Sequence, residues 1–218
     1  MRSGCGCYRP PVAEGTREPA LPLRACLLSG GESRRMGRDK ALLPHPAGGT
    51  WLEQSLRRLL ALELPVTLCS RHPQHLELAR GLEPAITVIR EEPPWEGPLL
   101  ALQRLMQHHP EQRLLLCPVD MPALSVAALQ QLLAAAATEP ALIHLAHDGQ
   151  RLQPLLGIYA SDAAQRASLS QAITGGERRL QTWLARQDCR PVALDPEALR
   201  NVNRPEELEQ LSRATAPG

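Results

Sequence analysis

Short apolar runs alternate with amphipathic stretches along most of this 218-residue chain. Five runs have the length and apolar content of buried strands, at residues 25–28, 66–69, 86–89, 114–117 and 141–145. Four intervening stretches repeat apolar residues at helical spacing, at residues 51–62, 74–80, 99–108 and 125–137. Two further short strands are expected at residues 155–159 and 191–194, with an antiparallel orientation open for the first. This alternation predicts right-handed crossovers, and therefore an α/β fold with a mostly parallel sheet and helices on both faces.

The chain length suits one domain with a full core. Residues 1–22 combine several prolines and glycines with no periodicity, so they are expected to form a disordered extension before a domain at residues 23–212. Residues 213–218 are expected to be a tail. No apolar run reaches the roughly 18 residues that span a bilayer, and the N-terminus lacks the apolar core of a signal peptide, which predicts a cytoplasmic location.

Charge and aromatic content narrow the function classes. The 24 basic residues almost balance the 23 acidic ones, which gives no field for gripping nucleic acid. Phenylalanine is absent and aromatic residues make up 2% of the chain, so recognition of a nucleobase by aromatic stacking is not expected. Cys26, Cys69 and Cys117 lie in apolar runs and are expected to be small core residues. Cys5 and Cys7 lack the partners of a zinc site.

The segment at residues 28–40 has the composition of a phosphate-binding loop. It follows an apolar strand and combines three glycines with arginines and Lys40. Glycines let consecutive backbone N–H groups approach an anion, and the cations neutralise its charge. Arg38 and Asp39 separate Gly37 from Lys40, which excludes a Walker A loop, and the glycine spacing excludes the dinucleotide fingerprint.

The same segment resembles the signature of the molybdenum cofactor guanylyltransferases, the MobA-like nucleotidyltransferases, written L-A-G-G-x-S-x-R-M-G-x-D-K. Ser29 stands where alanine is usual, and the other specified positions match. The resemblance implies a single-domain Rossmann-like nucleotidyltransferase fold. It also implies that Arg35 and Lys40 are catalytic. The nucleotide is then expected to contact Leu28, Ser29, Gly30, Gly31 and Lys40.

Asp120 is the second candidate for chemistry. A buried run at residues 114–117 leads to this carboxylate, which lies between Pro118 and Pro122 at the end of the predicted strand. Such a carboxylate suits Mg²⁺, which takes one or two protein oxygens and completes its shell with phosphates and water. The resemblance implies the same role for Asp120, together with contact to the nucleotide and a part in catalysis. The alternative is a helix cap, for which Ser125 is better placed.

Glu91 occupies the position where the family carries an acid that helps to hold the nucleotide. A carboxylate accepts hydrogen bonds from the N1–H and the amino group of guanine, an edge that adenine and cytosine lack. A solvated loop acid is the alternative, because Glu92 and Glu96 are close in sequence. Residues 96–101 resemble the family's Gly-Pro-Leu-Ala-Gly segment, with Leu100 and Ala101 in place of its alanine and second glycine.

The resemblance continues to residue 211. Residues 147–151 are similar to the family's segment before an antiparallel strand, and residues 176–179 to its Gly-Glu-Arg-Arg segment, which makes Arg178 a candidate for pterin binding. Asn201 and Asn203 belong to an Asn-x-Asn-x-Pro-Glu-Glu-Leu ending and are the other candidates, because asparagines bond both phosphate and pterin amide edges. A helix-cap role for Asn203 stays open.

A molybdenum cofactor guanylyltransferase joins GMP from GTP to the terminal phosphate of molybdopterin with Mg²⁺ as cofactor and releases pyrophosphate. The resemblance therefore implies GTP and molybdopterin, with or without its molybdenum, as substrates. It also implies molybdoenzymes or other cofactor-assembly proteins as further partners, and neither nucleic acid nor membrane. No Ser-His-Asp or Cys-His set is evident in the sequence, and none is needed. Two alternatives stay open: a transferase that uses CTP or a sugar or polyol phosphate, and a catalytically idle protein that holds or delivers the pterin cofactor.

Overall fold

Seven strands form one sheet in the part of the chain that the computed structural model describes, residues 21–31 and 37–202. The strands are β1 (Leu23–Leu28), β2 (Val66–Ser70), β3 (Thr87–Arg90), β4 (Arg113–Pro118), β5 (Ile143–His147), β6 (Leu152–Ala160) and β7 (Cys189–Ala193). Their order across the sheet is β3-β2-β1-β4-β6-β5-β7. Only β6 runs against its two neighbours, and all other neighbouring pairs are parallel. The predicted mostly parallel sheet is confirmed, as is the antiparallel alternative for residues 155–159.

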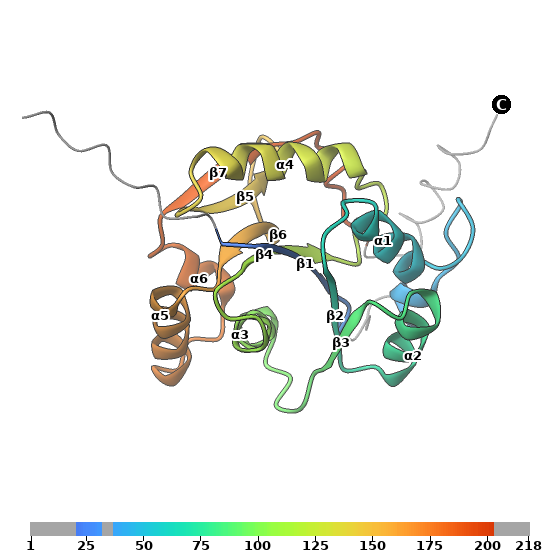
Figure 1. Cartoon of the computed structure of the whole chain (residues 1–218), viewed down its shortest axis with the longest axis horizontal. Helices are drawn as coiled ribbons and strands as arrows, with labels where there is room; N and C mark the ends of the chain where they lie inside the picture. The colour runs from blue at the N-terminus through green and yellow to red at the C-terminus, as the bar shows by residue number, and fades with distance from the viewer. Residues whose placement is uncertain (1–20, 32–36, 203–218) are drawn as a thin grey trace, which may run out of the picture.

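Helices cover both faces of this sheet (Figure 1). They are α1 (Trp51–Leu60), α2 (Pro73–Leu82), α3 (Pro98–His108), α4 (Val126–Thr138), α5 (Ala163–Thr174), α6 (Leu180–Leu184) and the single 3-10 turn η1 (Lys40–Leu42). Buried residues of α1, α2 and α4 form one hydrophobic cluster with the sheet, and those of α3, α5 and α6 form another. The architecture is therefore three-layered, as the strand and helix alternation predicts.

Side chains of the central strands alternate between the two clusters. On β1, Ala25 and Leu27 pack beneath α1, α2 and α4, whereas Cys26 packs on the opposite face. Cys69 and Cys117 are also buried, which confirms the core role predicted for these cysteines. Burial raises the pKa of the Cys69 thiol to about 12, because a thiolate would lose its hydration there. These cysteines are packing residues rather than nucleophiles.

Local capping signals fix where several helices begin. Thr50 Oγ1 accepts from the Glu53 backbone N–H at 3.2 Å and Glu53 Oε2 accepts from the Thr50 N–H at 2.6 Å, a reciprocal capping box at the start of α1. Ser125 Oγ accepts from the Ala128 N–H at 3.1 Å and caps α4. The cap that the sequence assigns to Ser125 is confirmed, so Asp120 does not serve as the cap of α4.

The predicted elements differ most from the observed ones at the fifth strand and at two helices. The fifth strand spans Ile143–His147 rather than residues 141–145, because the Leu142 N–H closes a turn onto the Glu139 carbonyl at 3.1 Å and pairing starts one residue later. Two helices, α5 and α6, were not predicted. One residue of α5, Leu169, is fully buried, and α6 has five residues, so neither displays a readable apolar period.

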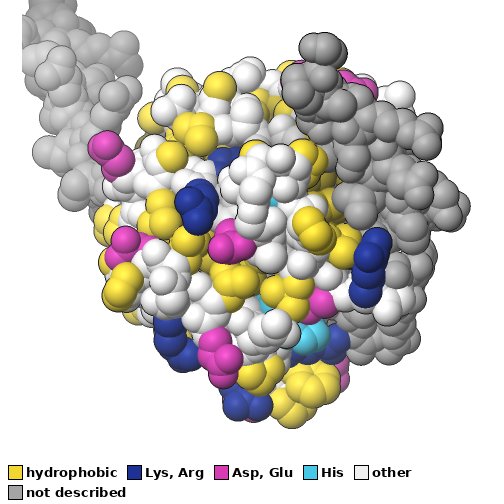
Figure 2. All heavy atoms as spheres, turned by 90° about the vertical axis from the view of Figure 1, so that its right-hand side faces the viewer, with side chains coloured by type: hydrophobic (Ala, Val, Ile, Leu, Met, Phe, Trp, Pro, Cys, Tyr) yellow, Lys and Arg dark blue, Asp and Glu magenta, His cyan; other side chains and the backbone are white. Residues whose placement is uncertain are grey.

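Surface features agree with the balanced charge of the chain. Figure 2 shows one face on which acidic and basic side chains are interspersed with apolar ones, without a continuous basic patch among its described residues. Among the helices at residues 21–31 and 37–202, none is long and apolar enough to cross a membrane.

The described chain is hydrogen-bonded to the sheet just before β1. The Pro22 carbonyl accepts from the Arg113 N–H of β4 at 2.8 Å.

Candidate active site

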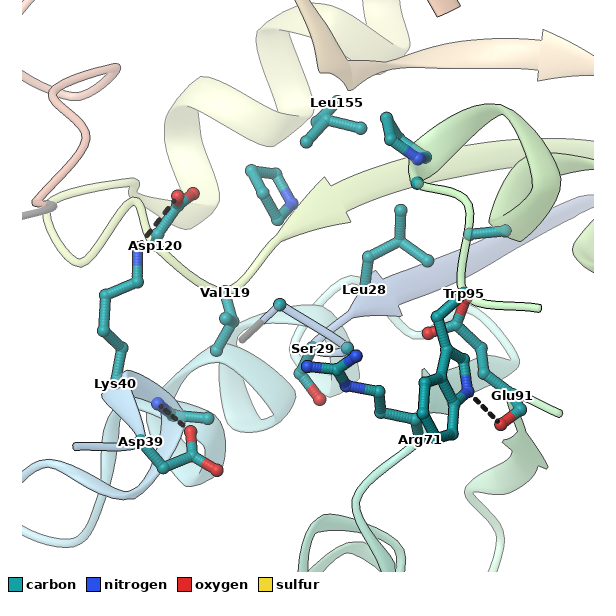
Figure 3. A pocket seen from close by; sticks show the side chains of 17 residues that line it. Leu28, Ser29, Asp39, Lys40, Arg71, Glu91, Trp95, Val119, Asp120 and Leu155 are labelled. Atoms are coloured by element: carbon teal, nitrogen blue, oxygen red, sulfur yellow. Dashed lines mark hydrogen bonds and ion pairs between the residues drawn. The ribbon is translucent and has the colours of Figure 1, made fainter. Parts of the chain in front are cut away.

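The carboxyl ends of the four strands β1 to β4 surround a cavity of about 570 Å³. The chain passes from β1 to β2 on one side and returns as β4 on the other, so the strand order reverses beside β1. Open α/β sheets bind ligands at such a reversal, outside the carboxyl ends of their strands. Figure 3 shows Lys40 beside Asp120 at one end of this cavity and Trp95 at the other.

The described part of the glycine segment lines the cavity directly after β1. Gly30 and Gly31 belong to the lining, together with Leu28 and Ser29. A Cβ atom on residue 30 would collide with Glu91 Oε2, so a larger residue there would displace this carboxylate, whereas Gly31 has open space around it. Backbone N–H groups on glycines that border a cavity suit an anionic ligand such as a phosphate.

Lys40 is placed on the cavity wall by η1. Its Nζ donates to Asp120 Oδ2 and to the Val202 carbonyl, each at 3.3 Å. Asp39 precedes it, and its Oδ1 caps η1 by accepting from the Ala41 N–H at 3.0 Å. Lys40 is also the sequence's single lysine, all other strongly basic side chains being arginines. The structure therefore brings together Lys40 and Asp120, two of the three charged side chains that the sequence predicts for the chemistry.

Asp120 lies on the boundary between the first cavity and a second one. The second cavity measures about 360 Å³ and shares four lining residues with the first, namely Pro98, Pro118, Asp120 and Leu155. The Asp120 carbonyl accepts from the Val202 N–H at 3.0 Å, which fastens the C-terminal segment to the loop after β4. A carboxylate common to two cavities, paired with a lysine in the first of them, is suited to a reaction between two separately bound substrates.

Two of the three pterin candidates line the second cavity. Arg178 lies in the loop between α5 and α6 and forms an ion pair with Glu96. Asn201 also lines this cavity, and its Oδ1 is buried without a hydrogen-bond partner among the described residues. A buried acceptor without a donor is costly, so a ligand N–H at this position would be stabilised.

Metal binding by the described residues would depend on few ligands. No group of three or more histidine, cysteine, aspartate or glutamate side chains in residues 21–31 and 37–202 is arranged to hold an ion. Asp120 is nevertheless a partly exposed carboxylate on the cavity wall, and Asp39 on the same wall is occupied by a histidine and a backbone N–H. One carboxylate beside a phosphate-binding segment fits Mg²⁺, which takes its other oxygens from phosphates and water.

Glu91 lines the opposite end of the first cavity but is not a solvated acid. Its side chain is about 10% exposed, and its Oε1 lies 3.3 Å from Arg104 Nη1. Arg104 comes from α3, so this ion pair ties the loop after β3 to that helix. The carboxylate is thereby held against Gly30, in an orientation that the protein fixes. The alternative of a solvated loop acid is wrong for Glu91.

An aromatic ring lies beside Glu91, contrary to the expectation drawn from composition. Trp95 lines the cavity and is 54% exposed, and its indole N–H donates to the Glu91 carbonyl at 3.1 Å. The Arg71 guanidinium lies over this ring at 5.0 Å from its centroid. No local motif distinguishes Trp95 from the other two tryptophans of the sequence. Its place in the site becomes visible only when the fold brings the strand ends together around one cavity.

The remaining predicted residues are placed as follows. Arg35 and Asn203 lie outside the described residues, so their roles stay predictions. Leu100 is buried and Ala101 lines the first cavity near the start of α3, where the family's second glycine is expected. Asp148 begins the turn into β6, as residues 147–151 predict, and backbone N–H groups of residues 151 and 150 lower its pKa to about 2.

The sheet with its strand-end cavity, glycine segment and Lys40–Asp120 pair defines a nucleotidyltransferase of the α/β class. Residues 25–192 match the family model described as MobA-like NTP transferase domain. A probable molybdenum cofactor guanylyltransferase from Rhodopirellula baltica is 38% identical over 193 residues, which cover 86% of this chain and 90% of that protein. The chain therefore belongs to the MobA-like NTP transferase family.

Solved structures agree on the fold. The molybdopterin-guanine dinucleotide biosynthesis protein A from Archaeoglobus fulgidus superposes with a TM-score of 0.69 at 19% identity, covering 88% of this chain and 97% of that one. A 4-diphosphocytidyl-2C-methyl-D-erythritol synthase from Anaerococcus prevotii gives a TM-score of 0.71 at 9% identity, covering 89% of this chain and 96% of that one. At these identities the likeness establishes the fold and leaves the substrate to the site.

Proposed function

We propose that this protein transfers GMP from GTP to the terminal phosphate of molybdopterin and releases pyrophosphate. The observation that carries the proposal is the position of Asp120, paired with Lys40, on the wall that two cavities share. Gly30 and Gly31 line the first cavity, and Arg178 and Asn201 line the second. The name given to the Rhodopirellula baltica relative supports this choice of substrates.

The protein's task in this reaction is alignment and charge neutralisation. A phosphate oxygen of molybdopterin forms a bond to the α-phosphorus of GTP, and the bond from that phosphorus to the bridging oxygen of pyrophosphate breaks. The attacking group arrives on the substrate, so no protein nucleophile is required. Backbone N–H groups of Gly30 and Gly31 bind the triphosphate, and Lys40 neutralises charge on the α-phosphate and the departing pyrophosphate.

Mg²⁺ is part of the proposal, with Asp120 as the residue that would hold it. When bound, the ion would supply positive charge that stabilises the charge developing on the phosphate oxygens. Asp120 Oδ2 accepts a hydrogen bond from Lys40 Nζ, so the aspartate also orients the lysine. Both effects depend on the same carboxylate.

The acceptor is expected in the second cavity. The unpartnered Asn201 Oδ1 offers an acceptor to the N–H groups of a pterin ring, and Arg178 supplies positive charge at the cavity wall. Arg178 forms an ion pair with Glu96, which lies in the loop between β3 and α3. The two substrates would thus be held by neighbouring segments on either side of Asp120.

The base of the nucleotide is expected between Glu91 and Trp95. The Glu91 carboxylate is oriented by Arg104 and can accept from the two donors on the guanine edge. The exposed face of Trp95 offers a stacking surface whose position is fixed by the Glu91 carbonyl and Arg71. Hydrogen bonds would select the base, and stacking would add affinity without selectivity.

Nucleotide binding should quench the fluorescence of Trp95. Trp51 and Trp183 are 1% and 2% exposed and would report little, so Trp95 is a built-in probe of this end of the cavity. Stacking is worth about 1–3 kcal/mol per base, and Trp95→Ala is expected to raise the KM for GTP about tenfold and abolish the quenching. Trp95→Phe should keep most of the affinity. Unchanged quenching in Trp95→Ala would show that the base lies elsewhere.

GTP should be preferred over CTP and ATP, and Glu91→Gln should erode this preference more than it lowers turnover with GTP. The amide places a donor against the donors of guanine, and a pairing of this kind is worth about 1–3 kcal/mol of discrimination. The measurement is kcat/KM for each nucleotide. Glu92→Gln is the matched control, because Glu92 is 68% exposed and pairs with Arg90. Selectivity lost in Glu92→Gln instead, or a wild-type preference for CTP, would contradict this assignment.

A further inference from the structure

A buried histidine outside the reaction described above joins both described ends of the glycine segment. His75 lies in the first turn of α2 and is 0% exposed. Its Nδ1 is 3.0 Å from the Oγ atoms of both Ser29, which follows β1, and Ser70, which ends β2. Its Nε2 is 2.8 Å from Asp39 Oδ2. Three segments that are distant in sequence therefore meet on one imidazole ring.

The ring proton that faces Asp39 can be assigned. Burial lowers the pKa of His75, which outweighs the opposing effect of the Asp39 charge. The Asp39 carboxylate has only acceptors, which places a ring proton on Nε2. Nδ1 faces the Ser29 and Ser70 hydroxyls at 3.0 Å, and Ser70 Oγ donates to the Ser29 carbonyl at 3.1 Å. The neighbouring His72 ring is a further titratable group that faces His75, with the two ring centroids 4.8 Å apart.

This cluster leads directly to the lysine of the active site. The Asp39 oxygen not bonded to His75 caps η1, whose first residue is Lys40. On the other side of the cluster, His72 Nε2 lies 3.4 Å from the Gly31 carbonyl. The first turn of α2 thus contacts the chain on both sides of residues 32–36.

A Ser-His-Asp set is therefore present, although none is evident in the sequence. It does not have the form of a nucleophile, because Ser29 is 3% exposed and Nδ1 also lies 3.0 Å from the Ser29 carbonyl. A reactive serine must present its oxygen to a substrate. Ser29 stands where the family signature has alanine.

We propose that His75 is a positioning residue: by joining Ser29 and Asp39 it fixes the backbone at both described ends of the glycine segment and holds Lys40 in register with Asp120. For its effect on turnover this inference rests on the proposed function. A misplaced lysine would lower charge stabilisation in the transition state more than nucleotide binding, since backbone N–H groups still hold the phosphates.

Two conservative variants separate this role from packing. The amide of His75→Gln reaches the position of Nε2 and can still donate to Asp39, whereas that of His75→Asn ends near Nδ1 and cannot. We expect His75→Asn to lower kcat at least tenfold with the KM for GTP within threefold, and His75→Gln to retain at least a third of wild-type kcat. Equal activities of the two variants would overturn the inference.

A matched control is available at the opposite end of the sheet. His109 is also buried, and its Nε2 lies 3.0 Å from Thr67 Oγ1 near the start of β2. His109→Asn is expected to leave kcat unchanged while lowering the melting temperature about as much as His75→Asn. An equal loss of kcat in His75→Asn and His109→Asn would show that the effect comes from general destabilisation and not from the contact with Asp39. If His75→Asn does not fold, Asp39→Ser removes the same contact, keeps an oxygen for the cap, and should show the same loss.

Amide hydrogen exchange at Ala41 reads the same contact without turnover. The Ala41 N–H is bonded to Asp39 Oδ1, so its exchange should quicken at least tenfold in His75→Asn and stay near the wild-type rate in His75→Gln. If the wild type does not transfer GMP but this exchange pattern is found, the proposed function fails and the positioning role stands. Equal exchange in all three proteins would contradict the positioning role itself.

Discussion

Replacement of Asp120 by alanine is expected to lower the rate of pyrophosphate release at least a hundredfold, about 2.7 kcal/mol of barrier. The substitution removes both the carboxylate that would hold Mg²⁺ and the acceptor that orients Lys40. The fold should persist, since the Asp120 side chain is 26% exposed and a partly exposed ion pair contributes about 0–1 kcal/mol to stability. Asp120→Asn keeps the shape without the charge and should lose most of the activity as well.

The measurement is pyrophosphate release from GTP and molybdopterin alongside a melting curve. Glu139→Ala is the control, because Glu139 forms a comparable exposed ion pair with Arg190 on a part of the surface that lines neither cavity. It should leave turnover unchanged. Activity of Asp120→Ala within about threefold of the wild type, less than about 0.7 kcal/mol of barrier, would remove Asp120 from the mechanism.

Lys40→Ala is expected to have the second largest effect, a loss of about thirtyfold or more in kcat, about 2 kcal/mol. The substitution removes the cation that the Asp120 carboxylate and the Val202 carbonyl hold on the wall of the first cavity. Lys40→Arg should restore only part of the activity, because a planar guanidinium does not replace a compact ammonium in a tight phosphate site. Normal turnover per folded molecule in Lys40→Ala would show that the segment is structural.

Because the sequence has a single lysine, the role of Lys40 can also be tested without a substitution. An amine-directed acylating reagent can modify only Lys40 and the terminal amine, and mass spectrometry distinguishes the two products. Acylation of Lys40 should abolish transfer, and GTP should slow that acylation. Full activity after complete acylation of Lys40 would contradict its role, as would normal turnover of Lys40→Ala.

The sheet was predictable because its signals are local. Buried strands such as β1 and β4 are continuous apolar runs, and α4 begins at the serine that caps it. The helix α5 was missed because Leu169 is its one fully buried residue, although the Asp162 cap, which accepts from the Gln165 N–H at 2.8 Å, was a usable signal. Where an element depends on contacts with distant parts of the chain, the local spacing of apolar residues does not predict it.

The site divides in the same way. Lys40, Asp120 and the glycines belong to motifs, and their meeting at strand ends follows from the parallel sheet. Trp95 and His75 carry no motif, since each acquires its role from residues that are remote in sequence. Arg104 on α3 likewise converts Glu91 from a loop acid into an oriented carboxylate. Such residues become visible only once the strand order places their segments side by side.

Product identification tests the central claim most directly. The purified protein is incubated with Mg²⁺, molybdopterin and an equimolar mixture of GTP, CTP, ATP and UTP, and the pterin products are separated and weighed by mass spectrometry. The predicted result is the guanine dinucleotide of molybdopterin as the main product, with one pyrophosphate released for each dinucleotide formed. A cytosine dinucleotide as the main product, or molybdopterin recovered unchanged beside intact GTP, would contradict it.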